Sequence, residues 1–314
     1  MKEKKVLNIA NFNLTFGKEN KPMLEYLEEI VLPAFKSKIE REDDGNRYLF
    51  DDVQIVELRG YYFIVGEFIK RTTLEIRSRY SEKDGIRDTN ERVPSDPYSL
   101  FIISLNNHRM ILIKNQKGSP DIRSFNTTAK IIIGQYVKNM NKEITIHKDK
   151  LPKPNLNVVA IPFSETIQQE LRKVKKVKYI KLKFYPLNGD IPVNSIFNAL
   201  REEMIEVGSK SASTTINTPK DHKKLSKLIS ETQGTVQPVL RVIDKNGSEK
   251  TLNDKSFTEN ITVEIDNEKD IIENMDTALG KVINNKDFNE TSEENKRLYD
   301  KFLHVIKKLK GQQV

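Results

Sequence analysis

Closely spaced cations are the residues of this sequence best suited to chemistry. Seven basic side chains occur between positions 172 and 183 with no acidic residue among them, and three lysines follow between 223 and 227. Each phosphate that a protein neutralises releases a counterion, so this density of charge suits the backbone of DNA or RNA. The alternative is that the lysines only keep an exposed face in contact with water and, near a helix C-terminus, interact favourably with the helix dipole. The predicted nucleic-acid-binding residues are Arg172, Lys173, Lys175, Lys176, Lys178, Lys181, Lys183, Lys223, Lys224 and Lys227.

Part of this basic run has the alternation of a strand. Lys181 and Lys183 share one face, whereas Ile180, Leu182 and Phe184 share the other. We therefore expect a cationic ridge on the solvent side of a sheet. Arginine is sparse in the run, which argues against bidentate reading of base edges.

A second group of residues could cleave a phosphodiester without a metal. The stretch from Asn106 to Arg109 places four hydrogen-bonding side chains at the tip of a predicted hairpin. His108 could act as the acid or base, and Arg109 and Arg123 could stabilise a pentacovalent phosphate. The predicted catalytic residues of such a nuclease are His108, Arg109 and Arg123. The alternative is an ordinary exposed turn.

Motifs for metals and cofactors are absent from the sequence. It has no cysteine, its four histidines are not three to five residues apart, and no glycine-rich phosphate loop occurs. Acidic pairs at 43–44 and 51–52 could hold Mg²⁺, but they are more typical of residues that flank a turn at Gly45. We expect no metal and no cofactor.

Several aromatic residues could stack on nucleic-acid bases. Their positions along predicted strands are more typical of core or cross-strand packing. These residues are Tyr61, Tyr62, Phe63, Tyr179 and Tyr185.

The elements that must position these residues indicate an α+β protein. We expect an N-terminal antiparallel-sheet domain with helices over residues 1–150, a ferredoxin-like basic domain over 151–266, and a helical C-terminal tail over 267–314. The first boundary is marked by Pro152 and Pro154, which favour stiff, extended backbone.

The N-terminal elements follow from apolar periodicity. Strands are expected over 6–16 and 144–146, helices over 23–35 and 125–140, and hairpins that pair 53–58 with 61–66 and 100–103 with 110–113. The polar stretch 77–96 contains Gly85 and Pro94 and predicts a long surface loop.

The second domain is expected to alternate strands with helices. Asn246-Gly247 is the strongest short hairpin signal in the chain, and it joins 236–243 to 249–252. Thr218-Pro219 is a signal for the start of a helix. The other expected elements are strands over 156–161, 179–184 and 261–265, and helices over 165–177, 192–207 and 219–231.

The C-terminal region carries an apolar stripe on a capped helix. The sequence Thr291-Ser292-Glu293-Glu294 predicts the start of this helix. Its stripe could dock a protein partner or a second copy, giving an oligomeric scaffold without catalysis, or it could pack on its own domain. The stripe comprises Leu298, Phe302, Val305, Ile306 and Leu309.

Composition limits the class of protein. The 314 residues carry a net charge of +8, and 37% of them are hydrophobic. No apolar run approaches the roughly 20 residues that span a bilayer, no signal peptide is evident, and the lack of cysteine suits a reducing compartment. We expect a cytoplasmic protein with no membrane insertion. Codon bias in an AT-rich genome is another explanation of the basic composition.

Two segments resemble a family of bacterial proteins of unknown function found near phage-defence and mobile genes. One is the opening strand from Leu7 to Leu14, and the other is the late hairpin from Val242 to Leu252, which a lysine-rich helix and Gly234 precede. The resemblance implies a role in anti-phage defence, as a sensor or an effector. It implies no catalytic residue.

Overall fold

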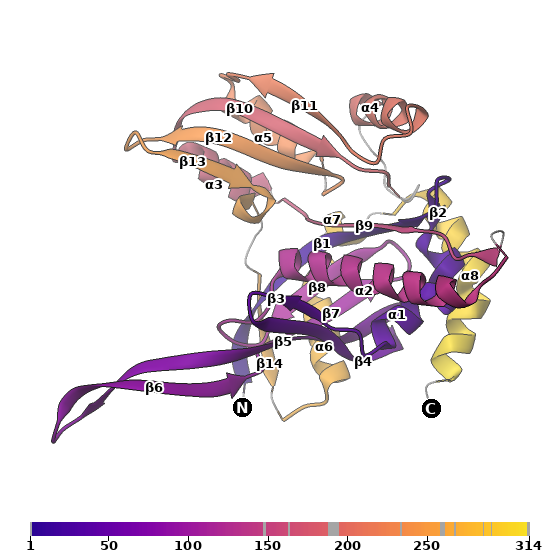
Figure 1. Ribbon diagram of the computed structural model, residues 1–314. Coiled ribbons are helices and arrows are strands. Elements are labelled where there is room, and N and C mark those ends of the chain that lie inside the picture. The colour runs from indigo at the N-terminus through magenta and orange to yellow at the C-terminus, as the bar shows by residue number, and fades with distance from the viewer. Residues whose placement is uncertain are drawn as a thin grey trace.

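The protein is a mixed α+β structure built on two antiparallel sheets. The computed structural model describes residues 2–146, 149–162, 164–187, 195–232, 234–257, 261–266, 268–284, 286–289 and 291–312. Ten strands of the described chain form a large curled sheet, and four form a smaller one (Figure 1). None of the helices in the described ranges combines the length and apolar character that crossing a membrane requires.

The large sheet has the central order β14-β1-β8-β7-β5-β4-β3. Strands β2 and β9 also pair with β1, and β6 pairs with β5. The strands are β1 (Lys2–Phe16), β2 (Lys21–Pro22), β3 (Arg41–Asp43), β4 (Asn46–Leu58), β5 (Tyr61–Ser81), β6 (Gly85–Ser95), β7 (Tyr98–Ser104), β8 (Arg109–Lys114), β9 (Pro154–Ala160) and β14 (Ile261–Asp266).

Helices pack on both faces of the large sheet and bury two apolar clusters. The described helical elements of this part are η1 (Met23–Tyr26), η2 (Leu27–Val31), α1 (Leu32–Lys36), α2 (Ile122–Glu143), α6 (Ile271–Val282), α7 (Lys286–Asn289) and α8 (Glu293–Gly311). Residues of η1, η2, α1, α2 and α8 contribute to the cluster on one face, and residues of α6 and α7 contribute to the other.

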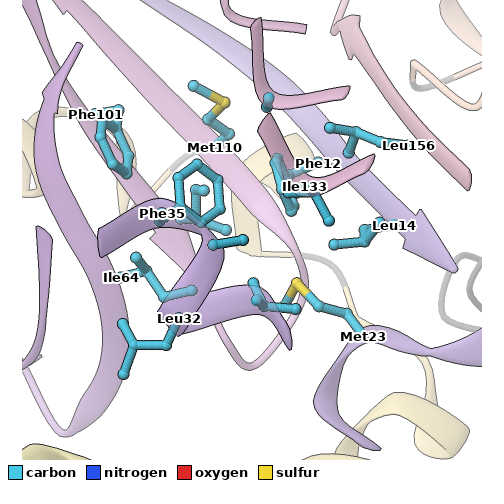
Figure 2. Packing of buried hydrophobic residues seen from close by; sticks show 14 of the residues in the cluster. Phe12, Leu14, Met23, Leu32, Phe35, Ile64, Phe101, Met110, Ile133 and Leu156 are labelled. Carbon is cyan, nitrogen blue, oxygen red and sulfur yellow. The ribbon is translucent and has the colours of Figure 1, made fainter. Parts of the chain in front are cut away.

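Aromatic rings fill the centre of the first cluster (Figure 2). The Phe35 ring lies 4.8 Å from that of Phe50, and the Phe125 ring lies 5.3 Å from that of Phe101. Phe12 projects from β1 into the same cluster, because even-numbered residues of this part of β1 face it. Edge-to-face contacts of this kind stabilise a core beyond the burial of area alone.

The smaller sheet belongs to an insert in the large one, which we define as residues 164–257. Its strand order is β11-β10-β12-β13, and every pair is antiparallel. Its described elements are α3 (Ser164–Arg172), β10 (Val174–Phe184), α4 (Ser195–Glu206), β11 (Ala212–Asn217), α5 (His222–Ser230), β12 (Val236–Asp244), β13 (Glu249–Asn253) and η4 (Asp254–Phe257). A separate apolar cluster lies between this sheet and its helices.

The insert leaves and re-enters the large sheet along one side of β1. Strand β9 pairs with β1 from Phe16 to Ala10, and β14 continues the pairing from Leu7 to Lys2. Both strands run antiparallel to β1, so together they follow the path of one long strand that the insert interrupts.

This pairing differs from the expected second domain. The strands expected over 156–161 and 261–265 in a ferredoxin-like unit correspond to β9 and β14, and both pair with β1 in the large sheet. The expected ferredoxin-like topology is not confirmed. The helices after residue 267 are not a detached tail either, since α6 and α8 pack on the large sheet.

The hairpins were predicted well, and two other segments were not. Turns at Arg59-Gly60, Asn106-Asn107 and Asn246-Gly247 join paired strands as expected. The predicted surface loop at 77–96 is instead paired backbone of β5 and β6. The predicted strand at 144–146 is not formed.

Candidate nucleic-acid interface

The basic run lies where α3 gives way to β10. Leu171 and Val174 are buried on either side of the junction, and they leave Arg172 and Lys173 exposed between them. The turn after β12 packs against this point, because the backbone N–H of Lys245 donates to the carbonyl of Lys173 at 3.2 Å. A cation of the β12–β13 turn is thereby added to the run.

Helix α3 is shorter than the sequence predicted. It ends at Arg172 rather than near Val177, so Lys175, Lys176 and Lys178 lie on β10. Register shifts in the pairing with β12 occur between Val174 and Lys176 and again between Val177 and Tyr179. Lys175 and Lys176 are exposed consecutively rather than alternating between faces.

Two grooves adjoin at Arg172. One, of about 420 Å³, lies between α3 and α5 and is lined by Gln168, Leu171, Arg172, His222 and Lys223. The other, of about 580 Å³, lies between α3 and the β12–β13 turn and is lined by Gln169, Arg172, Lys173, Asp244, Lys245, Asn246 and Lys250. Five of the residues lining these two grooves are lysines or arginines.

Acidic residues neutralise only part of this charge. Lys173 pairs with Glu170 at 2.5 Å, and Lys250 pairs with Asp244 at 2.6 Å. In the part of the chain that the structure describes, no carboxylate forms an ion pair with the other cations of the junction. These are Arg172, Lys175, Lys176 and Lys245, and we call them with Lys173 the basic junction.

Asp244 stiffens the turn that holds Lys245. Its Oδ1 accepts hydrogen bonds from the backbone N–H groups of Asn246 and Ser248, each at 2.9 Å. The hydrogen bond from Lys250, and then that from Ser248, hold the pKa of Asp244 below its usual value. The carboxylate is therefore committed to the turn and to Lys250.

The outer face of the insert's sheet continues the basic surface. Ile180, Leu182 and Phe184 are buried, and Lys181 and Lys183 are half-exposed, in agreement with the expected alternation. The register pairs Lys181 with Val239 and Lys183 with Gln237 on β12.

The outer face also carries an acidic residue, Glu249, at the start of β13. Glu249 accepts from Lys178 at 2.8 Å and from Arg241 at 2.6 Å, and these contacts lower its pKa. Tyr179 pairs with Arg241 and keeps 36% of its surface exposed, which leaves a ring available beside the cations.

The lysines of α5 form a second basic surface beside the first groove. Asp221 caps this helix by accepting from the N–H groups of Lys223 and Lys224, each at 3.0 Å, so the expected cap at Thr218 is wrong. Lys223 lines the groove next to Arg172. Lys224 and Lys227 are exposed, and Lys227 lies 3.7 Å from Glu231.

The predicted nuclease residues do not share an accessible surface. His108 is 3% exposed and Arg109 is 1% exposed, whereas Arg123 is exposed in the first turn of α2. Arg109 donates to the side-chain oxygen of Asn11 on β1. A phosphodiester cannot reach buried groups in this conformation, so the arrangement does not support the proposed cleavage.

The hairpin tip instead anchors the C-terminal helices. Asn107 donates to the carbonyl of Phe288 at 2.7 Å, and Asn295 of α8 donates to the carbonyl of Asn106. The turn that suggested catalysis thus connects β7 and β8 to α7 and α8 through the side chain of Asn107 and the carbonyl of Asn106.

Three of the remaining candidates have structural roles. Asp43 pairs with Arg41 and Asp51 pairs with Lys38, each at 2.7 Å. Tyr62 is buried in the first apolar cluster of the large sheet. The described residues contain no group of three or more potential ligands that could hold a metal ion.

Two cations of the interface were missing from the predicted set. Lys245 and Lys250 lie about 70 residues after the basic run, and the Asn246-Gly247 signal predicted their hairpin without predicting what it packs against.

No protein-family model matches this chain, and no curated protein matches its sequence.

Proposed function

We propose that this protein binds nucleic acid through the basic junction and the adjoining outer face of the insert. The observation that carries the proposal is the presence at this junction of four cations without carboxylate partners in the described chain, of which Arg172 and Lys245 line two adjoining grooves. Within residues 161–257 the sequence has 17 basic and 11 acidic residues, so this region holds +6 of the chain's net charge of +8. A polyanion would be drawn to this end of the molecule.

The chemistry favours contacts with the phosphate backbone over reading of bases. Lysines act as flexible point charges, whereas bidentate contacts with guanine need the fork of an arginine. Arg172 is the single arginine of the basic junction. Tyr179 on the outer face offers a ring on which a base of a single strand could stack beside Lys181 and Lys183.

The test is binding to labelled single-stranded DNA and RNA of mixed sequence, measured by fluorescence anisotropy at several salt concentrations. Changing Arg172, Lys173, Lys175 and Lys176 together to Glu should weaken binding by about 100-fold near 0.1 M salt. For wild type, about four phosphate contacts predict a slope of log K against log salt of about −3.

A matched control separates this site from general charge. Lys138 and Lys142 on α2 and Lys301 and Lys307 on α8 are exposed, and changing these four to Glu alters the net charge equally. This control should keep most of the wild-type affinity. Equal losses in both variants, or a wild-type affinity that salt does not alter, would contradict the proposal.

In the defence role implied by the resemblance, this surface would be the part that senses or engages foreign nucleic acid. No observation in the structure favours the nuclease alternative. Its cheap test is incubation with RNA and DNA, with and without chelator. Cleavage that is lost in His108→Ala would revive it.

A further inference from the structure

The segment from residue 72 to 95, which we call the arm, extends away from the large sheet as a two-stranded ribbon (Figure 1). Up to Arg71, β5 pairs with β4, and up to Ile69 it pairs with β7. From Thr72 to Ser81 its partner is β6, and the outer edges of both strands have no strand beside them in the described chain. An isolated two-stranded ribbon is only marginally stable in water.

One face of the arm is apolar at two levels. Leu74 lies opposite Val93 near the base, and Tyr80 lies opposite Ile86 near the tip. Leu74 and Tyr80 are an even number of residues apart on β5, so they lie on the same face of the ribbon. On β6 a register shift between the partners of Ile76 and Ser78 adds one residue, which keeps Val93 and Ile86 on that face as well. Their exposed fractions are 54% and 43% at the base and 74% and 75% at the tip.

The other face and the tip are charged, the register places Glu91 and Asp88 between the two apolar levels, and the charge of the arm as a whole is balanced. Residues 72–95 contain five basic and five acidic side chains. Arg79 pairs with Glu91 at 2.5 Å, Arg92 pairs with Glu75 at 3.0 Å, and Arg87 pairs with Asp84. A ribbon with no net charge, whose arginines are already paired, has little attraction for a polyanion.

We propose that the arm is a self-association surface that docks on the arm of a second copy of this chain. A two-fold interface brings a surface against itself, so it requires a surface that does not repel itself. The neutral arm meets that requirement, whereas the insert at +6 does not. The proposal is independent of nucleic-acid binding.

The two apolar levels fit an antiparallel arrangement of the arms. The levels are six residues apart, or about 20 Å along a strand. When two arms pack face to face in opposite directions, the Tyr80–Ile86 pair of each covers the Leu74–Val93 pair of the other. Each arm then supplies the second layer that a lone ribbon lacks.

The experiment measures the mass of the full chain by light scattering from 1 to 100 µM protein. We expect a dimer of twice the 36.4 kDa chain at the upper concentrations. Replacing Tyr80 with Ser and Ile86 with Thr should shift the dissociation constant upward by about 100-fold, since two bulky apolar side chains are removed from each arm. Glu75→Ser with Arg77→Ser, on the opposite face, removes one charge of each sign and should leave it within about threefold. Far-UV circular dichroism checks that both variants are folded.

Cross-linking supplies a second readout. The chain has no cysteine, so Ser78→Cys gives a single thiol near the middle of the apolar face. Packed sheet faces lie about 10 Å apart, and a short bis-maleimide should therefore link two copies through Cys at 78 but not through Arg79→Cys on the other face.

A monomeric mass for wild type at 100 µM, or a dimer that the Tyr80 and Ile86 changes leave intact, would overturn the proposal. Loss of DNA or RNA affinity in that variant with no change in mass would show that the arm contacts nucleic acid instead.

Discussion

Glu67 on β5 lies opposite Asp51 on β4, next to the point where their pairing shifts register. Burial, and then the negative charges of Asp52 and Asp51, raise the pKa of Glu67 above its usual value. Asp51 differs because its hydrogen bond from Lys38 lowers its pKa. Three carboxylates are thus close together at this bulge, and Lys38 compensates only one of them.

Glu67→Gln should therefore stabilise the protein at neutral pH. A carboxyl whose pKa is raised on folding lowers stability when it is ionised, and this cost disappears as the pH falls below the unfolded value of about 4.3. We expect the free energy of unfolding to rise by about 0.5 kcal/mol at pH 7, because solvent screens a half-exposed group, and to change little at pH 4. Urea unfolding at both pH values checks this. Equal effects at both would show that charge is not the cause.

Single residues also explain why the nuclease hypothesis arose. His108 and Arg109 are residue types that catalyse phosphodiester cleavage, and a hairpin tip is commonly exposed. Sequence spacing contained no sign that α7 and α8, almost 200 residues later, would cover that tip. The local sequence pattern does not show when a segment far away in the sequence will bury a residue.

At the scale of elements, local signals predicted turns better than helix lengths. Gly60 and Gly247 adopt the positive φ that glycine favours, so the hairpins at Arg59-Gly60 and Asn246-Gly247 could be predicted. Leu171, Val174 and Val177 have helical spacing, yet the chain becomes a strand at Val174. Pairing with β12 outweighs the local preference there, and that partner lies more than 50 residues away.

The arm shows the opposite error. Its polar composition predicted a loop, because exposed apolar residues are few and the segment contains Gly85 and Pro94. Both residues fit a two-stranded ribbon: Gly85 lies at the turn with positive φ, and Pro94 lies on a strand whose outer edge is unpaired.

The C-terminal stripe packs on its own molecule: Ile306 and Leu309 are buried in the first core cluster, and Leu298, Phe302 and Val305 pack against it. Ile306 is fully buried in the first core cluster, and Lys308 and Lys310 pair with Glu28 and Glu57 beside it. The structure therefore supports the alternative in which this helix packs on its own domain.

Ile306→Ala should lower the free energy of unfolding by about 3 kcal/mol, since it leaves a cavity between α8 and the sheet. Lys307→Ala on the exposed side should change it by less than about 0.5 kcal/mol. Chemical denaturation of both variants is the measurement. A small effect of Ile306→Ala would show that α8 packs elsewhere.

At the scale of the whole molecule, the large sheet with two apolar clusters and the insert with a third are two parts whose segments alternate along the sequence. The proline-marked boundary at 151–155 separates α2 from β9, but β9 still belongs to the first sheet. Composition could locate the basic region. It could not show that this region is inserted, because the evidence is the pairing of β14 with the first strand of the chain.

Excising residues 162–258 and joining the ends with about four flexible residues should leave a folded large domain. Ala160 pairs with Ala10 and Ile261 pairs with Leu7, so the gap to close is three residues of strand, or about 10 Å. We expect one cooperative thermal transition and loss of nucleic-acid binding. Excision of 162–266, which also removes β14, should abolish the transition. Failure of the first variant to fold would show that the large sheet depends on the insert.

The interrupted strand has a mechanical consequence. Both tethers of the insert attach to the middle of β1, at neighbouring points, rather than to the ends of the sheet. A force that pulls the insert away from the large sheet would break the hydrogen bonds of β9 and β14 to β1 one after another, from the middle of β1 toward its ends. The bonds would not all be loaded at once, as they would be under a force along the strands. We therefore expect the first force-induced step to separate the insert, with its own apolar cluster intact, from the large sheet.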